Sequence, residues 1–159
     1  SYLFPRQIDG RYVMLSRKDR ENLYVATSDD VHFWDDAEEL HKPTKSWELI
    51  QIGNCGSPIE TEAGWLVLTH GVGPMRRYTI GALLLDLDDP TRVIGQLAQP
   101  LLEPDASERE GYVPNVLYTC GGLIHRDQLV LPYGFSDVGI GIALISLPEL
   151  LTQLAESAS

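Results

Sequence analysis

Short apolar runs recur three times along the chain, and each ends on one residue that breaks the apolar pattern. These runs are Val13–Arg17, Leu66–His70 and Leu129–Tyr133. A second strand-like run follows each of them, at residues 22–28, 78–85 and 140–147. Spacings of roughly 50–60 residues indicate a repeated β-unit, slightly longer than a propeller blade. Equivalent positions of a radial array converge on one axis, so we expect Arg17, His70 and Tyr133 to share a binding site.

Turn signals between the runs support β-hairpins. Asp9-Gly10 separates two apolar runs, which is a strong hairpin signal. Further turns are expected at 62–64 and 125–127. Pro5 precedes Arg17 by the same number of residues as Pro58 precedes His70. We therefore expect one β-domain of three repeat units, residues 1–42, 43–104 and 105–159. Only residues 148–156 are expected to form a short helix, with proline near its start.

The matched spacing of the repeat favours a β-propeller over a β-sandwich. A β-sandwich shares the turn signals, but it does not require a repeat, whereas a β-propeller does. Propellers have typically about four to eight blades, so three units cannot close a ring. We therefore expect a longer polypeptide, or another copy of the chain in an oligomer, to complete the ring.

Composition and charge exclude several classes of function. The 43% hydrophobic fraction and the 159-residue length are those of an ordinary soluble domain. A net charge of −11 opposes binding to nucleic acid. No apolar run approaches the ~18 residues of a membrane span, and the N-terminus lacks a signal-peptide pattern. Two isolated cysteines predict neither a disulfide framework nor a metal site. The sequence therefore predicts a cytoplasmic protein that contacts no membrane.

The residues that end the apolar runs are candidates for an anion site. Arg17 offers a planar fork of donors that matches phosphate, and His70 stands before a glycine that lets a ligand approach. The alternative is that Arg17 pairs with Asp19 or Glu21 in solvent and that His70 is an ordinary edge residue. Their matching position in the repeat favours the shared site.

Three other segments carry candidate chemistry. Asp137 follows Tyr133 and a glycine, so the pair could bind a sugar, or the aspartate could cap a turn. Residues 51–58 hold small residues among polar ones, so their backbone could let a ligand approach closely, or they could form a structural loop between units. They lack the lysine of a phosphate-binding loop. Glu60 alternates with an apolar neighbour and could face inward. The acidic pairs are expected in solvated turns, at 29–30, 35–36, 38–39 and 88–89.

Several motifs, in order along nearly the whole chain, resemble glycoside hydrolase family 130, the family of β-mannoside phosphorylases and related β-mannosidases. They are Leu3-Phe4-Pro5, Gly10-Arg11-Tyr12, Ile52-Gly53, Gly56 to Thr61, Gly64-Trp65-Leu66, His70-Gly71-Val72, Ile80 to Pro90, Gly111 to Val116 and Pro132-Tyr133-Gly134. The resemblance implies a five-bladed β-propeller, of which this chain covers about three blades at the C-terminal end.

The resemblance also implies roles for individual residues. Arg17 and His70 correspond to phosphate-binding residues, and Gln51 stands where phosphorylases usually have a lysine. Asp137 corresponds to a sugar-binding aspartate, with Tyr133 beside it. The family's catalytic acid belongs to a segment upstream of Ser1, so we expect no catalytic residue in this chain and no activity from it alone.

The expected function is part of an inverting β-mannoside phosphorylase. Phosphate would be the co-substrate, without a cofactor or metal, and the substrate a manno-oligosaccharide or mannosyl sugar. The product of phosphorolysis would be mannose 1-phosphate. One alternative is a β-mannosidase that uses water, which Gln51 favours. Another is a non-catalytic sugar-binding or assembly module made from a truncated propeller.

Overall fold

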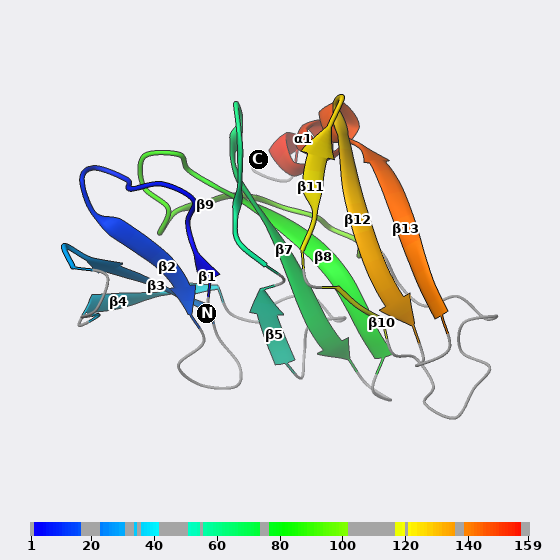
Figure 1. Cartoon of the computed structure of the whole chain (residues 1–159), viewed down its shortest axis with the longest axis horizontal. Helices are drawn as coiled ribbons and strands as arrows, with labels where there is room; N and C mark the ends of the chain where they lie inside the picture. Colours follow the sequence, from blue (N-terminus) through cyan, green and yellow to red (C-terminus); the bar gives the residue numbers. More distant parts are fainter. Residues whose placement is uncertain are drawn as a thin grey trace.

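The computed structural model describes residues 2–16, 23–30, 34, 36–41, 51–54, 56–73, 77–101, 117–119, 121–135 and 139–156. These residues form three antiparallel sheets and one short C-terminal helix. Figure 1 shows the three sheets side by side, with the sheet of green strands between the other two. The expected all-β class with a short C-terminal helix is confirmed.

The N-terminal sheet is a simple antiparallel meander in the order β1-β2-β3-β4. Its strands are β1 (Tyr2–Leu3), β2 (Tyr12–Ser16), β3 (Leu23–Ser28) and β4 (Asp36–His41). The turn before β2 has positive φ at Asp9 (52°) and Gly10 (74°), between the bridged pair Ile8 and Arg11. Two positive φ angles are what a tight hairpin requires, so the turn predicted from Asp9-Gly10 is confirmed.

The central sheet is built around two long strands, β7 and β8. Its strands are β5 (Gln51–Asn54), β6 (Ile59–Thr61), β7 (Gly64–Gly73), β8 (Arg77–Leu85) and β9 (Val93–Gln96). Strand β8 pairs with β7 along its length, while β6 and β5 pair with the beginning and the end of β7. The two short strands therefore share the other edge of β7.

The C-terminal sheet repeats this plan with one strand fewer. Its strands are β10 (Leu117–Tyr118), β11 (Leu123–His125), β12 (Gln128–Phe135) and β13 (Gly139–Ser146). Strand β13 pairs with β12 along its whole length, and β10 and β11 share the opposite edge of β12. Arg126 (φ 51°) and Asp127 (φ 61°) make the turn predicted between β11 and β12.

The central sheet is buried on both faces. One face carries Leu66 and Leu68, which pack in a core cluster with Leu129 and Leu131 of the C-terminal sheet. The other face carries Trp65 in a second cluster with strands of the N-terminal sheet. Because both faces of the sheet are covered, the sequence of β7 between Trp65 and Leu68 is continuously apolar and does not alternate between apolar and polar residues.

Two hydroxyls interrupt this apolar interior. Thr69 and Thr79 are each only 1% exposed. They lie on the same face of the central sheet, since Thr69 pairs with Gly81 and Thr79 with Gly71. Among the buried side-chain atoms of the described residues, the Oγ1 atoms of these two threonines make no hydrogen bond.

Helix α1 (Leu147–Glu156) covers the end of the first core cluster through Leu150 and Leu154. Pro148 lies in its first turn, where a missing N–H costs nothing. Gly95 of β9 lets the helix approach, because a Cβ at that position would overlap the carbonyl oxygen of Leu154. No helix in the described part of the chain is both long and apolar enough to span a membrane.

Two sequence-based expectations were wrong. Asp36 and the pair Glu38-Glu39 lie on strand β4 rather than in turns, because β3 offers its hydrogen-bonding edge to this segment. Charged residues are common on such edge strands. Residues 51–54 form β5 rather than a loop, because β7 extends beyond β6 and its remaining edge pairs with them. Asp88 and Asp89 are exposed beside a turn, as expected.

Candidate functional site

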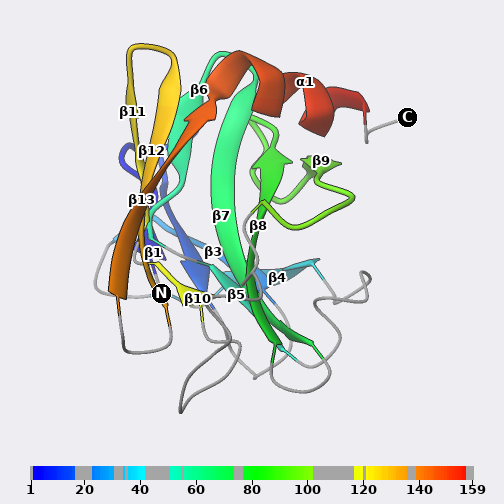
Figure 2. The same ribbon diagram turned by 90° about the vertical axis from the view of Figure 1, so that its right-hand side faces the viewer.

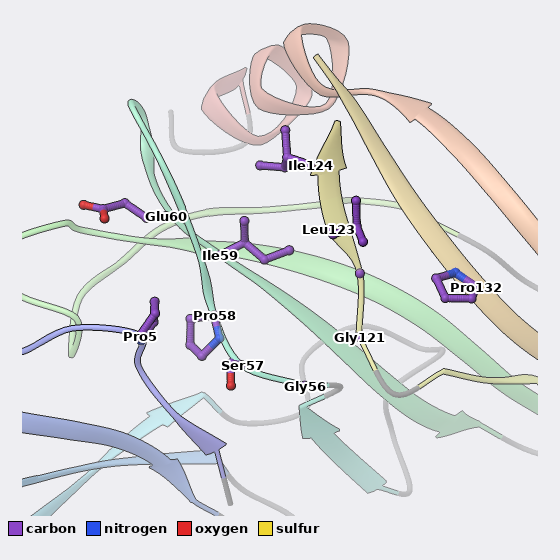
Figure 3. Close-up of a pocket in the computed structure, with 11 residues that line it drawn as sticks. Pro5, Gly56, Ser57, Pro58, Ile59, Glu60, Gly121, Leu123, Ile124 and Pro132 are labelled. Atoms are coloured by element: carbon purple, nitrogen blue, oxygen red, sulfur yellow. The ribbon is translucent and has the colours of Figure 1, made fainter. Parts of the chain in front are cut away.

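A cavity of about 540 Å³ lies where the three sheets meet. Its lining comes from the segment after β1, from β6 and the residues before it, from β11 and the residues before it, and from one residue of β12. The lining residues are Pro5, Gly56, Ser57, Pro58, Ile59, Glu60, Gly121, Gly122, Leu123, Ile124 and Pro132. Figure 3 shows most of them around the opening. The lining is largely apolar, and none of the described residues in it carries a positive charge.

The repeat seen in the sequence is present in this lining. Pro5 and Pro58, each twelve residues before a predicted site residue, both line the cavity. Strand pairing makes Gly122 the equivalent of Pro58, since Ile59 pairs with Leu66 and Leu123 pairs with Val130. Gly122 also lines the cavity, so equivalent positions converge on one space. The same register makes Gly134 the equivalent of His70, so the expectation that Tyr133 is equivalent to His70 was wrong by one residue.

An ion pair joins the N-terminal and central sheets beside the cavity. The Arg6 guanidinium donates to the Glu60 carboxylate through Nη2 (2.7 Å) and Nε (3.0 Å). It also lies 5.0 Å from the centroid of the Trp65 ring, which is fully buried. The hydrogen bond from Arg6 is the main cause that lowers the pKa of Glu60. Glu60 is exposed, contrary to the possibility that it faces inward.

Trp65 holds the same junction together from the inside. Its ring meets the Phe4 ring edge to face, with the centroids 5.0 Å apart. Its Nε1 donates a hydrogen bond of 3.1 Å to the carbonyl oxygen of Leu87. A buried tryptophan usually needs such a partner for its N–H. Two elements far apart in the sequence, the segment after β1 and strand β7, are thereby fixed together.

His70 lies on β7, with Gly53 of β5 on one side and Ile80 of β8 on the other. It is partly buried and follows Leu66 and Leu68 on the face that packs against the C-terminal sheet. Gln51 lies two residues before Gly53 on β5, opposite Val72. The fold therefore brings the backbone of Gln51 and the predicted phosphate-binding histidine to the same end of the central sheet.

Tyr133 lies on β12 and packs against the first core cluster. Its ring lies across Gly141 of β13, where a Cβ would come within 2.5 Å of the phenol oxygen and 2.9 Å of Cε1. Its neighbour Pro132, rather than Tyr133, belongs to the cavity lining.

Two predicted site residues lie outside the described residues. Arg17 follows the last residue of β2, and Asp137 falls between β12 and β13. Their predicted roles on phosphate and sugar stay predictions, as do those of His70, Gln51 and Tyr133. In the described ranges, no group of three or more histidine, cysteine, aspartate or glutamate side chains is placed to hold a metal ion.

A family model described as beta-1,4-mannooligosaccharide phosphorylase, of glycoside hydrolase family 130, matches residues 1–156. A curated relative is the 1,2-beta-oligomannan phosphorylase of Thermoanaerobacter sp. (strain X514), 39% identical over 150 residues. That match covers 93% of this chain and 50% of the relative. The beta-1,2-mannobiose phosphorylase of Listeria innocua is 34% identical over 163 residues, which are 98% of this chain and 46% of the relative.

Solved structures show the same relationship. The Listeria innocua beta-1,2-mannobiose phosphorylase, solved with beta-1,2-mannobiose, superposes with a TM-score of 0.84 at 34% identity. It matches 96% of this chain and 45% of its own. A structure described with glycoside hydrolases of the family that target beta-1,2 mannosidic linkages in Candida mannan has a TM-score of 0.73 at 27% identity, over 87% of this chain and 44% of its own. The chain spans about half the length of the curated relatives it matches.

Proposed function

Because this chain belongs to glycoside hydrolase family 130, we propose that it forms the phosphate-binding part of an inverting β-mannoside phosphorylase. The observation that carries the proposal is the family match over residues 1–156, together with relatives at up to 39% identity that are mannoside phosphorylases. Phosphate would attack the anomeric carbon of mannose from the face opposite the leaving group. The C–O bond to the next sugar breaks, and that oxygen takes a proton from an acid outside this chain.

The phosphate would bind at the end of the central sheet that carries His70 and Gln51, together with Arg17. Strand β5 places the backbone of Gln51 two residues from Gly53, the partner of His70. A chain with a net charge of −11 must gather local hydrogen-bond donors and positive charge to hold a dianion. An imidazole N–H and a guanidinium fork supply these donors. Asp137 and Tyr133 would bind the sugar.

The proposed fold is a five-bladed propeller in which the three sheets are three blades. The support is geometric: three antiparallel sheets stand side by side, and segments from all three line one cavity. This arrangement is what radial repetition around a channel produces. The repeat units 1–42, 43–104 and 105–159 would then each supply one blade.

A hydrolase is the second candidate, and one observation favours it. Gln51 replaces the lysine usual in phosphorylases, which removes one positive charge from the proposed phosphate site. A structural neighbour comes from a study of glycoside hydrolases within the family. In a hydrolase, a carboxylate would activate water in place of phosphate.

The test combines this chain with the unmatched half of the Thermoanaerobacter relative, fused or co-expressed. The assembled protein is incubated with β-1,2- and β-1,4-manno-oligosaccharides, with and without inorganic phosphate. We expect mannose 1-phosphate to form only when phosphate is present. Free mannose released at the same rate without phosphate would establish the hydrolase instead.

A pair of histidine variants shows whether the proposed site is used. We expect His70→Ala to raise the KM for phosphate by roughly tenfold or more, the size of one lost charge-assisted hydrogen bond. The matched control is His125→Ala, because His125 is exposed at the end of β11 next to the turn. An equal effect of both substitutions would argue against a phosphate site at His70.

A further inference from the structure

Two buried hydroxyls of the central sheet have no role in the proposed function so far. Thr69 and Thr79 are buried, and their Oγ1 atoms make no hydrogen bond in the described structure. Thr69 pairs with Gly81, and Thr79 pairs with Gly71. The two threonines are therefore diagonal neighbours across β7 and β8, roughly 7–8 Å apart. One group with several hydrogen-bond donors can reach both oxygens.

These hydroxyls lie at the end of the central sheet where we place the phosphate. Thr69 directly precedes His70 on β7, and it pairs with Asn54 of β5 on its other side. Gln51 belongs to the same short strand β5. Figure 2 shows β5 beside this end of β7. Because side chains alternate along a strand, Thr69 is on the opposite face of the sheet from His70.

The face that carries the threonines packs against the N-terminal sheet. Trp65 and Val67 precede Thr69 at alternate positions of β7, and both belong to the second core cluster. Val13 and Leu15 of β2 belong to the same cluster. The side chains of β2 that share a face with these two residues are therefore turned toward the row that ends in Thr69.

The contacts of Phe4 show how β2 is aligned with β7. Its backbone N–H donates a hydrogen bond of 2.9 Å to the carbonyl oxygen of Val13, and its ring packs on Trp65. The first part of β2 is therefore level with the first part of β7, and both strands run toward the same end of the molecule (Figure 1). The alternation of Val13 and Leu15, continued by one step, leads to Arg17.

The chemistry of an arginine on phosphate matches the two hydroxyls. A guanidinium has more N–H groups than a bidentate contact with phosphate uses. The remaining N–H groups need acceptors when the side chain is held between sheets. A threonine hydroxyl can accept hydrogen bonds, and those of Thr69 and Thr79 have no donor in the described structure. The donors that an arginine leaves over and the acceptors that lack a partner are therefore complementary.

The C-terminal sheet has a hydroxyl at the equivalent position. Strand register makes Tyr133 the equivalent of Thr69, one position before the equivalent of His70. Both residues have a glycine as partner on the next strand, Gly81 for Thr69 and Gly141 for Tyr133. Tyr133 packs in the first core cluster, on the side of the central sheet that carries His70. In both sheets a hydroxyl thus faces the preceding sheet, which carries a predicted phosphate ligand.

We propose that Thr69 and Thr79 are positioning residues that accept hydrogen bonds from the Arg17 guanidinium when phosphate is bound. The inference rests on the proposed phosphate site, in which Arg17 is a ligand. Without phosphate the two hydroxyls stay unpaired, and this lowers the stability of the sheet. With phosphate they fix the plane of the guanidinium, so that its other N–H groups point at the phosphate oxygens.

The test uses the assembled protein described for the proposed function, with phosphate varied at saturating manno-oligosaccharide. We expect Thr69→Val and Thr79→Val each to raise the KM for phosphate by roughly tenfold, the size of one charge-assisted hydrogen bond. The kcat should change by less than about twofold. Thr69→Ser keeps the hydroxyl and should leave this KM near that of wild type. The matched control is Thr152→Val, at an exposed position of helix α1, which should have no effect.

An Arg17→Met background shows whether the hydroxyls act through Arg17. In that background Thr69→Val should change the KM for phosphate by less than about twofold, because the donor is already absent. The melting temperature of this chain without phosphate provides a second measurement. A merely structural defect would not combine weaker phosphate binding with a more stable chain.

Four outcomes would overturn the positioning role. The KM for phosphate could be unchanged in both valine variants, or Thr69→Ser could raise it as much as Thr69→Val. The effect of Thr69→Val could persist undiminished in Arg17→Met. Finally, Thr69→Val could lower the melting temperature and leave the KM unchanged, which would assign the hydroxyls to a buried water. Free mannose released by the wild type without phosphate would instead contradict the proposed function, and the positioning role with it.

Discussion

The ring of Tyr133 lies across Gly141, its direct partner on the neighbouring strand, and fills the space that a side chain at position 141 would occupy. An aromatic ring over a cross-strand glycine covers backbone that would otherwise be bare. The glycine thus fixes the position of the phenol at the inner face of the C-terminal sheet. The two residues should behave as one unit when either is changed.

Gly141→Ala should therefore destabilise the protein by about 1–3 kcal/mol, the range for overpacking a site with one extra methyl group. The ring of Tyr133 must move, because the new Cβ would overlap it. Urea unfolding followed by circular dichroism measures the cost. In a Tyr133→Ala background the same substitution should cost much less, and equal costs in both backgrounds would contradict the contact.

Gly95→Ala should cost more than Gly141→Ala. At position 95 the obstructing atom is the backbone carbonyl oxygen of Leu154 in helix α1, which cannot rotate away as a side chain can. The helix must shift, and Leu150 and Leu154 would lose part of their burial. We expect a loss of about 2–4 kcal/mol in urea unfolding. A smaller loss than that of Gly141→Ala would show that the helix is loosely attached.

Glu60→Gln should reduce the sensitivity of the fold to acid. The hydrogen bond from Arg6 lowers the pKa of Glu60 below its ordinary value of 4.5. The ion pair therefore stabilises the fold above that value, and the stabilisation disappears as the pH falls through the lowered pKa. We expect the melting temperature of Glu60→Gln to lie roughly 2 °C below wild type at pH 7, and the two to converge as the pH falls through the lowered pKa of Glu60.

The matched control for this pH experiment is Glu62→Gln, in the exposed turn between β6 and β7. Glu62 is outside the ion pair, so this variant should follow the wild-type melting curve at every pH. If Glu62→Gln and Glu60→Gln lower the melting temperature by the same amount, the cause would be the loss of one negative charge and not the contact with Arg6.

Gln51→Lys should strengthen the proposed phosphate site. In the assembled protein it adds a positive charge on β5, two residues from the partner of His70. We expect the KM for phosphate to fall by about tenfold, which corresponds to about 1.4 kcal/mol. Gln99→Lys adds the same charge at an exposed position elsewhere and should have no effect. An unchanged KM for phosphate in Gln51→Lys would show that position 51 takes no part in phosphate binding.

Local sequence signals were sufficient for the hairpins and the helix. Asp9-Gly10 allows positive φ at both positions, and Pro148 is compatible with a first helical turn, so these elements follow from local chemistry alone. Strand β4 was not predictable in this way. Its acidic residues favour a solvated turn, and only pairing with the edge of β3 makes it a strand.

The site was predictable only where the repeat preserved its register. The matched separations of Pro5 and Pro58 from the ends of their apolar runs indicated that equivalent positions converge, and both prolines line the cavity. The contact between Arg6 and Glu60 joins residues 54 positions apart. No local pattern relates such positions, because their meeting depends on how the two sheets pack.

Thr69 and Thr79 lower the stability of the central sheet, and their replacement should raise it. Each buries a hydroxyl that forms no hydrogen bond within the described structure, and such a group costs about 1–3 kcal/mol. Valine has nearly the same shape, so Thr69→Val and Thr79→Val should each raise the melting temperature. The two valine substitutions would therefore add stability that the natural sheet lacks. Mutations that create new specificities, usually at a cost in folding, would be better tolerated in that background.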